Sequence, residues 1–377
     1  MKKVLFTVLV VLLLAGLAAS YALDKFGTAA RAWLFGYPLV LMDATARASA
    51  DHFGPDASNR FFHSETFPDH RFRAVVKPNN DTLYSFAWLD LSGQPVVLSA
   101  PDTRGRYYVM PLMDAWTNVF ARVGKRTTGT GGGSWLIAGP NWEGTTPAGL
   151  ELIRSPTDLV WLLGRIQTNG RDDVPAVKRL QQEFTLAPLS LWREGRHNPP
   201  LEMGAEPDKR DVSPKEEVAQ LSAGEFLTRM TRLMQTQPPS PADAPALAEF
   251  AGLGILQGQV FDLAHSGPVK RLLIERGVEY MRDNLLNELS RRRTVENGWF
   301  IARHSIGNYG TDYGMRAGVA LIGLGALPPA EASSPSTTVD SNGRPLSGKH
   351  RYRIRFLPGE TPPADAFWSL TMYNEED

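Results

Sequence analysis

Short segments separated by turn residues constrain the fold of this chain more than any other feature. Between residues 51 and 156, the strings GPDASN, PNND, LSGQP, PDTRG and GPNWEGTTP alternate with runs such as TLYSFAWLDL, PVVLSA and SWLIAG. The runs are rich in β-branched and aromatic residues, whereas Gly, Pro, Asn and Asp are the residues that turns require. This spacing predicts antiparallel strands, and we expect a first β-sandwich over residues 51–156.

The pattern changes to a helical one after this region. The string SPTDLVWLLGRIQTNG offers Ser155 as an N-cap, Pro156 in the first turn and Gly170 after the last turn. We therefore expect a helix here, and a second one in DVPAVKRLQQEFTLAPL. Apolar residues at helical spacing predict three more helices, at about 223–235, at 244–250 and in VKRLLIERGVEYMRDNLLNELSRRR.

These helices predict a mainly helical connector over residues 157–330. Strand-like runs return in RYRIRF and FWSLTMY, so residues 331–377 are expected to begin a second β-sandwich. Ahead of the first sandwich, residues 23–50 have a broad apolar surface typical of a helix, which Pro38 should bend. The expected fold is thus mixed β and α, with two antiparallel, jelly-roll-like sandwiches joined by a helical segment.

The first 22 residues form an export segment. Two lysines precede an apolar run over residues 4–19, and Ser20 and Ala22 follow at the spacing of a signal peptidase site, with the cut after Ala22. The alternative is an uncleaved membrane anchor, since residues 4–23 could just span a bilayer as a helix. Both interpretations place the rest of the chain in the periplasm or at the outer face of the inner membrane.

Composition and motifs exclude several classes of function. Lys plus Arg and Asp plus Glu are equal at 40 each, which argues against a nucleic-acid partner. The absence of cysteine excludes thiolate nucleophiles, thiolate zinc sites and iron–sulfur clusters. The sequence has no nucleophile elbow, no H-E-x-x-H and no P-loop lysine, and no cofactor is predicted.

No metal site is predicted either, because none of the seven histidines pairs with another at a ligand spacing. His63 and His70 share the string FHSETFPDH with Glu65 and Asp69. A carboxylate–histidine cluster is conceivable there, but a solvated loop is the simpler interpretation.

The string PNNDTLYSFAW is the leading candidate for a binding site. Asn79, Asn80 and Asp81 suit a turn, because their side chains bond to nearby backbone groups. In the following run, Tyr84 shares one parity with the next aromatics, Phe86 and Trp88, and aromatics on one parity usually indicate a sandwich core. The alternative is a cleft in which these rings stack on a ligand, with the polar residues at its rim.

Two other strings have a similar composition. In RYYVMPLMDAWTN and the following KRTTG, a carboxylate lies in an apolar row, and Arg122 or Arg126 could pair with it. The candidate ligand-binding residues here are Arg106, Tyr108, Asp114, Trp116, Asn118, Arg126 and Thr127. In GNYGTDYGMR, the candidates are Tyr309, Asp312, Tyr313 and Arg316, which would crowd one face if the segment is helical. For both strings, structural packing or ion pairing is the competing explanation.

Several of these strings together resemble one bacterial family, which is defined by the paired domains of unknown function 1254 and 1214. The resemblance is carried by FGYPLVLMD, KPNNDTLYSFAWLDL, GRYYVMPLMDAWTNVF, KRTTG, GNYGTDYGMRAGVA and PPADAFWSLTMY. It implies an exported, envelope-associated protein built of two sandwich domains joined by helices, and it implies no established activity. Family members usually continue past FWSLTMY, whereas NEED follows here, so we expect a truncated second sandwich or one that a partner completes.

Three functions remain open at this point. The first is a protein that binds a small carbohydrate- or lipid-like ligand between aromatic side chains. The second is a hydrolase or lyase that uses Asp81 or Asp114 as acid or base, with Tyr84 or Tyr108 assisting. The third is a structural component of the envelope, and a homo-oligomer is compatible with any of them.

Overall fold

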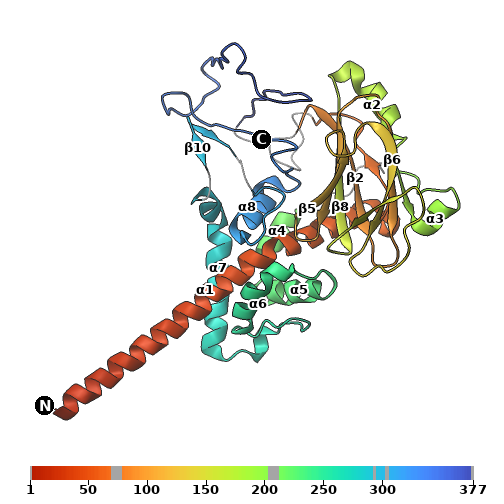
Figure 1. Ribbon diagram of the computed structural model, residues 1–377. Coiled ribbons are helices and arrows are strands. Elements are labelled where there is room, and N and C mark those ends of the chain that lie inside the picture. The colour runs from red at the N-terminus through yellow and green to blue at the C-terminus, as the bar shows by residue number, and fades with distance from the viewer. Residues whose placement is uncertain (1, 69–78, 203–211, 292–293, 302–304, 375–377) are drawn as a thin grey trace. The chain divides into compact units, whose positions relative to one another are not determined.

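The computed structural model describes residues 2–68, 79–202, 212–291, 294–301 and 305–374 (Figure 1). The chain divides into two units, which we call the helical unit and the β-unit. The helical unit comprises Met1–Ala48, Lys209–Arg291 and Tyr309–Leu321. The β-unit comprises Ser49–Asp208, Arg292–Asn308 and Ile322–Asp377.

Two sheets form most of the β-unit. The five-stranded sheet has the order β1 (Phe62–His63), β2 (Thr82–Asp90), β8 (Leu159–Gln167), β4 (Tyr108–Asp114) and β5 (Val119–Gly124). The four-stranded sheet has the order β7 (Glu151–Arg154), β6 (Gly131–Ala138), β3 (Val96–Asp102) and β9 (Thr185–Pro188). All neighbours are antiparallel as predicted, except β6 and β7, which are parallel.

One hydrophobic cluster draws side chains from both sheets. The five-stranded sheet contributes alternate residues, such as Leu83 and Leu89 of β2, and the four-stranded sheet contributes Leu98 and Ile137 among others. Alternation of this kind buries one face of each strand, as the pleat of a strand requires. This cluster defines an inner face of the five-stranded sheet, and the opposite side is called the outer face below.

The prediction of a helix around residues 157–170 was wrong. Residues Leu159–Gln167 form β8, which lies between β2 and β4 in the centre of the five-stranded sheet. A central strand that is covered on both sides reads as a continuous apolar run, so VWLLGRI has no strand alternation. The second predicted helix is shortened to α2 (Val174–Gln181), and β9 follows it, so the sheets extend well beyond residue 156.

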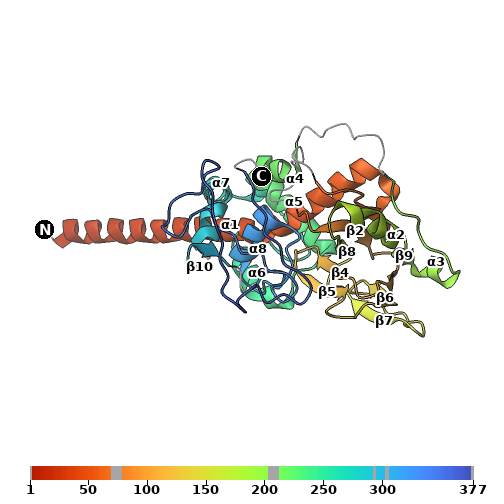
Figure 2. The same cartoon turned by 90° about the horizontal axis from the view of Figure 1, so that it is seen from above.

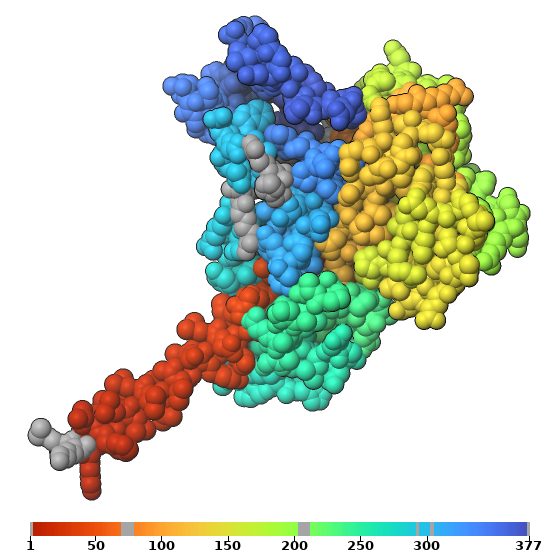
Figure 3. All heavy atoms as spheres, viewed as in Figure 1, coloured from red at the N-terminus to blue at the C-terminus, as the bar shows by residue number. Residues whose placement is uncertain are grey.

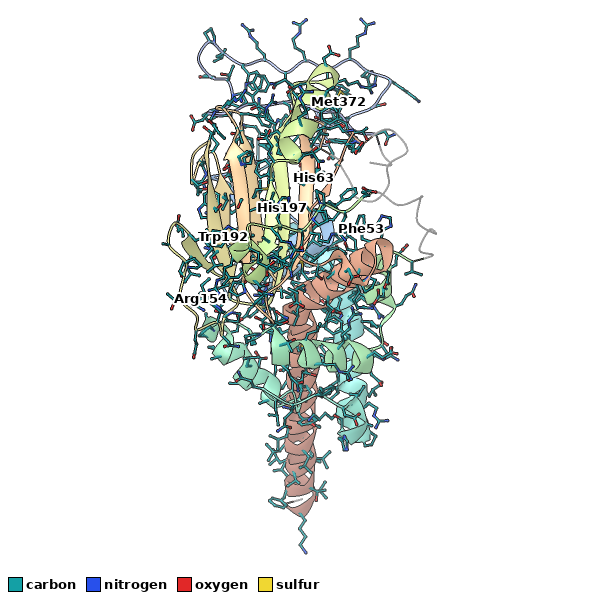
Figure 4. The ribbon with its side chains drawn as sticks, turned by 90° about the vertical axis from the view of Figure 1, so that its right-hand side faces the viewer. Phe53, His63, Arg154, Trp192, His197 and Met372 are labelled. Atoms are coloured by element: carbon teal, nitrogen blue, oxygen red, sulfur yellow. The ribbon has the colours of Figure 1, made fainter. Side chains whose placement is uncertain are left out.

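The predicted strands of a second sandwich are not formed. In the described part of residues 331–377, RYRIRF and FWSLTMY have no regular secondary structure. Most of their apolar side chains are exposed, including Ile354, Phe356 and Met372, the last of which is labelled in Figure 4. A strand needs a neighbour to accept its backbone hydrogen bonds. Among the described residues nearby, pairing is limited to β10 (Val295–Glu296) with β11 (Trp299–Phe300) and to isolated bridges such as Phe300 with Ser336.

The helical unit contains the four helices expected from apolar spacing. These are α1 (Lys2–Phe53, which extends into the β-unit), α5 (Ala223–Thr236), α6 (Ala244–Ala251) and α7 (Pro268–Arg291). It also contains α4 (Pro214–Gln220), which was not predicted, and α8 (Tyr313–Gly323), which the sequence left open. Ser213 and Ser222 begin α4 and α5 with capping boxes, in which the serine and the glutamate three residues later satisfy each other's backbone N–H groups. These caps fix where the two helices begin.

The second half of α1 is the core of this unit. Trp33 packs on Phe226 of α5, Phe35 packs on Phe250 of α6, and Phe26 packs on Tyr280 of α7. The helix is continuous from Lys2 to Phe53 and includes Pro38.

The first half of α1 stands alone (Figures 1 and 2). Residues 4–23 include a run of exposed valine, leucine and phenylalanine side chains, which no other described part of the chain covers (Figure 3). The stretch is long and apolar enough to cross a membrane, with a mean hydropathy of 2.5 in its most apolar window. A long apolar N-terminal helix of this kind fits a signal sequence or a membrane anchor.

Candidate functional site

The aromatic row of β2 lies on the outer face, not in the core. Leu83, Ala87 and Leu89 belong to the core cluster, whereas Tyr84 and Phe86 of the other parity are only partly buried. The interpretation that the aromatic parity marks the core is therefore wrong for Tyr84 and Phe86. Trp88 is buried, at 8% exposed, but it lies outside that core cluster. Both parities of β2 carry apolar side chains, so the sequence alone could not tell which face is inward.

Aromatic and arginine side chains gather on this outer face. Trp88 of β2 is paired across the strands with Trp161 of β8, and their rings stack at 5.1 Å with an angle of 3°. Arg165 follows Trp161 by four residues in β8 and lies on the same face. Its guanidinium is 5.6 Å from the centre of the Tyr84 ring. A cation over an aromatic face is attracted by the ring quadrupole. The outer face thus combines stacked rings with a positive charge.

A segment of the chain that follows α8 lies against the outer face. Arg165 Nη2 donates a hydrogen bond to the backbone oxygen of Gly325 at 2.8 Å. Gly325 has φ +88°, and a Cβ there would lie 2.5 Å from Leu163 Cδ2, so both its conformation and its close approach to β8 require glycine.

Glu331 holds the same segment at the edge of the face. Tyr107 Oη donates to its Oε1 at 2.9 Å, and Arg126 Nε donates to its Oε2 at 2.7 Å. The Glu331 side chain is 1% exposed, so this carboxylate depends on its two donors. Burial, together with the negative charge of Glu331, raises the pKa of Tyr107, which therefore stays a neutral donor.

We expect Glu331→Gln to loosen the segment around residues 325–331. The amide keeps an acceptor for Tyr107 but removes the charge opposite Arg126. Arg126 is partly exposed, so the expected loss is only about 1 kcal/mol, or about a fivefold faster exchange of the amides of Ala326 and Glu331. Hydrogen exchange measured by mass spectrometry checks this, with the exposed Glu360→Gln as the control. Unchanged protection in Glu331→Gln would mean that other contacts hold the segment.

Three N–H donors of the outer face are buried without an acceptor among the described residues. They are Nε of Arg122, Nε of Arg165 and Nε1 of Trp161. Buried polar atoms in folded proteins nearly always have a partner, so each of these three needs an explanation.

The turn before β2 is built as the sequence predicts. Asn79 Oδ1 accepts the backbone N–H of Asp81 at 2.7 Å, and Asn79 Nδ2 donates to Thr82 Oγ1. Asn80 is exposed. The Asp81 carboxylate accepts a hydrogen bond from Ser369 Oγ at 2.6 Å, which joins FWSLTMY to the end of the five-stranded sheet.

Asp114 organises the turn between β4 and β5. Its Oδ1 accepts the backbone N–H groups of Trp116 at 2.9 Å and Asn118 at 2.8 Å, and its Oδ2 accepts a bond from Asn118 Nδ2 at 3.1 Å. Thr117 has φ +70°, a conformation that this carboxylate cap helps to hold. The expected partner Arg126 pairs with Glu331 instead.

The remaining candidates of the β-unit are dispersed. Tyr108 is fully buried in the core cluster beside Phe184, on the inner face and therefore opposite Tyr84. Arg106 forms a bidentate ion pair with Asp173 at 2.6 and 2.9 Å. Thr127 Oγ1 donates to the backbone oxygen of Arg122 at 2.8 Å.

The candidates of GNYGTDYGMR lie in the helical unit. Asp312 caps α8 by accepting the backbone N–H of Met315 at 3.1 Å. Tyr313 Oη donates to the buried Asp243 at 2.9 Å, and burial together with Asp243 raises the pKa of Tyr313 to about 12. The Arg316 guanidinium is buried and lies 5.1 Å from the centre of the Tyr313 ring. Tyr309 is also buried.

His63 is not in a solvated loop, contrary to the simpler sequence interpretation. It lies in β1 and is 6% exposed, with Nδ1 2.9 Å from Ser85 Oγ inside the β-unit (Figure 4). Gln181 of α2 donates to the backbone oxygen of Tyr84 and to Ser85 Oγ beside it. Burial lowers the pKa of His63 to about 4, so the ring is neutral at pH 7. His70 and Asp69 lie outside the described residues.

Within the described ranges, no group of three or more His, Asp or Glu side chains could hold a metal ion. The chemistry available on the outer face is therefore that of N–H donors, cationic guanidiniums and aromatic rings. Of the candidates from the sequence, Tyr84 and Arg126 contribute to this face and Asp81 lies at the end of the sheet. Trp161 and Arg165 were not predicted as site residues because residues 157–170 were expected to be helical. Tyr107 and Glu331, which lie outside that range, were not predicted either.

This fold and site define a class of mixed α/β protein, in which a two-sheet unit with an arginine- and aromatic-lined outer face accompanies a helical unit that begins with a long apolar helix. Profiles of two protein families of unknown function match the chain, DUF1254 over residues 58–188 and DUF1214 over residues 331–377. Both of the domain families that the sequence strings resemble are therefore matched in this chain, in the same order.

The structure is similar to the crystal structure of the VPA0106 protein from Vibrio parahaemolyticus, with a TM-score of 0.62 and 24% sequence identity over 86% of this chain and 73% of that one. An uncharacterised protein from Burkholderia cenocepacia covers 79% of this chain and 67% of its own at 14% identity, but its TM-score of 0.29 supports no structural argument. No curated protein sequence matches the chain.

Proposed function

We propose that this protein binds a small carbohydrate- or lipid-like molecule on the outer face of the five-stranded sheet. The observation that carries the proposal is the placement of Tyr84, Trp88 and Trp161 on the side of the sheet away from the core cluster. Aromatic faces with a few convergent polar groups are the common composition of small-molecule sites.

We propose binding in preference to acid–base catalysis because of the roles that the two candidate carboxylates already have. Asp114 accepts backbone N–H groups in a turn, and Asp81 accepts the Ser369 hydroxyl. A general acid or base must reach a substrate proton at about 3 Å, which competes with these bonds.

We also propose that the two sheets form a β-sandwich exported across a membrane, with residues 4–23 of α1 retained as its anchor. Twenty helical residues at 1.5 Å each give about 30 Å, the thickness of the hydrocarbon core. The continuous helix through Ala22 supports retention, because α1 continues directly into the packed residues of the helical unit.

Native mass spectrometry tests these proposals on the protein purified in mild detergent from the membranes of cells that make it. We expect a retained small molecule on the wild-type chain and an intact amino terminus. Trp161→Ala should lose the molecule, whereas Trp192→Ala, which truncates a partly buried tryptophan of α3 (Leu189–Arg193), should keep it. A wild-type chain without any bound molecule, or equal retention in Trp161→Ala, would contradict the binding proposal. A chain that begins at Leu23 would contradict the anchor.

A further inference from the structure

The three buried donors of the outer face surround one point of the sheet. Trp161 and Arg165 lie two residues on either side of Leu163 in β8. Arg122 of β5 is paired with Pro111 of β4, the strand between β5 and β8. From strand spacings, the Cα atoms of Arg122 and Arg165 are roughly 12 Å apart, close enough for two extended arginine side chains to reach one small group between them.

The charges around this point do not balance. Within the structure as described, neither Arg122 nor Arg165 has a carboxylate in ion-pairing distance, and the nearby Glu331 is engaged by Arg126. Arg165 has the backbone oxygen of Gly325 and the Tyr84 ring, both uncharged. Two guanidiniums with buried, unsatisfied N–H groups are costly unless an acceptor is supplied, and an anion is the acceptor that also balances their charge.

The shape of the acceptor follows from what lies beside the donors. Guanidiniums bind planar carboxylates through paired N–H groups, so a carboxylate matches Arg122 and Arg165. The partly exposed Trp161 ring offers an apolar surface next to it, and the Trp161 N–H could serve a further oxygen.

We propose that the outer face binds a small organic acid. Its carboxylate accepts hydrogen bonds from Arg122 and Arg165, and its apolar body lies on Trp161. This inference rests on the proposed function and narrows its ligand to an anionic molecule, such as an aryl or alkyl carboxylic acid or an acidic sugar.

The experiment compares a carboxylate with its neutral amide. The full chain in lipid nanodiscs is titrated with phenylacetate, with phenylacetamide and with inorganic phosphate over a millimolar range, and the dissociation constant and the melting temperature are measured. We expect phenylacetate to bind and to raise the melting temperature. Phenylacetamide should bind at least about tenfold more weakly, because it loses a charge-assisted bond to each arginine.

Variants assign the effect to the residues. Arg122→Met keeps the length of the side chain and removes its charge, so it should weaken phenylacetate at least about tenfold. Arg171→Met, at an exposed position of the same unit, should leave the dissociation constant unchanged.

Phenylacetate and phenylacetamide could bind equally well to the wild type and both fail to bind to Trp161→Ala. That result would overturn the proposal that the ligand is an anion, but it would support the small-molecule site. Absence of binding by both would count against both proposals. If phosphate bound as tightly as phenylacetate, the proposal that the apolar part of the ligand contributes to binding would be wrong.

The melting temperature measured without ligand provides an independent test of the proposal. If Arg122 awaits an external acceptor, Arg122→Met should melt at the same temperature as the wild type or higher, because a buried unsatisfied cation is removed. A clear fall in the melting temperature of Arg122→Met, with Arg171→Met unchanged, would show that the guanidinium has a structural acceptor and would overturn the proposal.

Discussion

Gly277→Ala should destabilise the helical unit by about 2 kcal/mol, although alanine is the better helix former. Gly277 lies within α7, where a Cβ would collide with the backbone oxygen of Phe26 in α1 and lie 3.0 Å from the Cβ of Ala29. Backbone atoms cannot rotate away, so the two helices must separate. Overpacking of this kind reaches about 3 kcal/mol, and the gain in helix propensity returns only about 1 kcal/mol.

Gly224→Ala is the matched control, because it is the same substitution in α5. A Cβ at residue 224 would meet Leu263 at 3.4 Å, which is ordinary contact. We expect no change, or a stabilisation of up to about 1 kcal/mol. Thermal melts followed by the helical signal at 222 nm compare the two variants. The proposed α1–α7 packing would be wrong if both variants changed stability in the same direction.

Lowering the pH from 7 to 5 should destabilise the β-unit by about 2 kcal/mol through His63 alone. Burial lowers the pKa of His63 from its ordinary 6.5 to about 4 in the folded protein. Between these values the unfolded chain binds a proton that the folded chain does not bind. The free energy of unfolding therefore falls as the pH falls from 6.5 towards 4. Above pH 6.5, His63 is neutral in both states and causes no such loss.

His63→Gln isolates this contribution, because glutamine can still bond to Ser85 but does not titrate. Urea unfolding at pH 7, 6 and 5 should show a steeper loss of stability in the wild type than in the variant. The other titrating groups are common to both proteins and cancel in the comparison. Parallel pH profiles would show that His63 is already protonated, or is solvated, in the folded protein.

The strands of the β-unit were largely predictable, and the failures have local causes. In β2–β6, turn residues separate short runs, and that signal is local. In β8, Ser155 and Pro156 imitate a helix start, while Ser155 instead bonds to the backbone of Thr157 in a turn. Apolar residues on both faces of β8 removed the alternation that would have identified a strand.

The candidate site was predictable only where its residues are close in sequence. The turn at Asn79 and Asp81 follows from side chains that bond to their own neighbourhood. The grouping of Arg122, Arg165 and Trp161 depends on the strand order β8–β4–β5 and on register, which are properties of the assembled sheet. An unsatisfied buried N–H group is likewise visible only once the surroundings of the atom are known.

The unbroken course of α1 has a mechanical consequence. The exposed apolar residues of its first half and the packed residues around Trp33 and Phe35 belong to one continuous helix, which has no loop between them and includes Gly27. If a lipid bilayer surrounds the first half, the helix would therefore couple the orientation of that half rigidly to the helical unit. The tilt and rotation of the membrane segment would be transmitted directly to the packing of α5, α6 and α7.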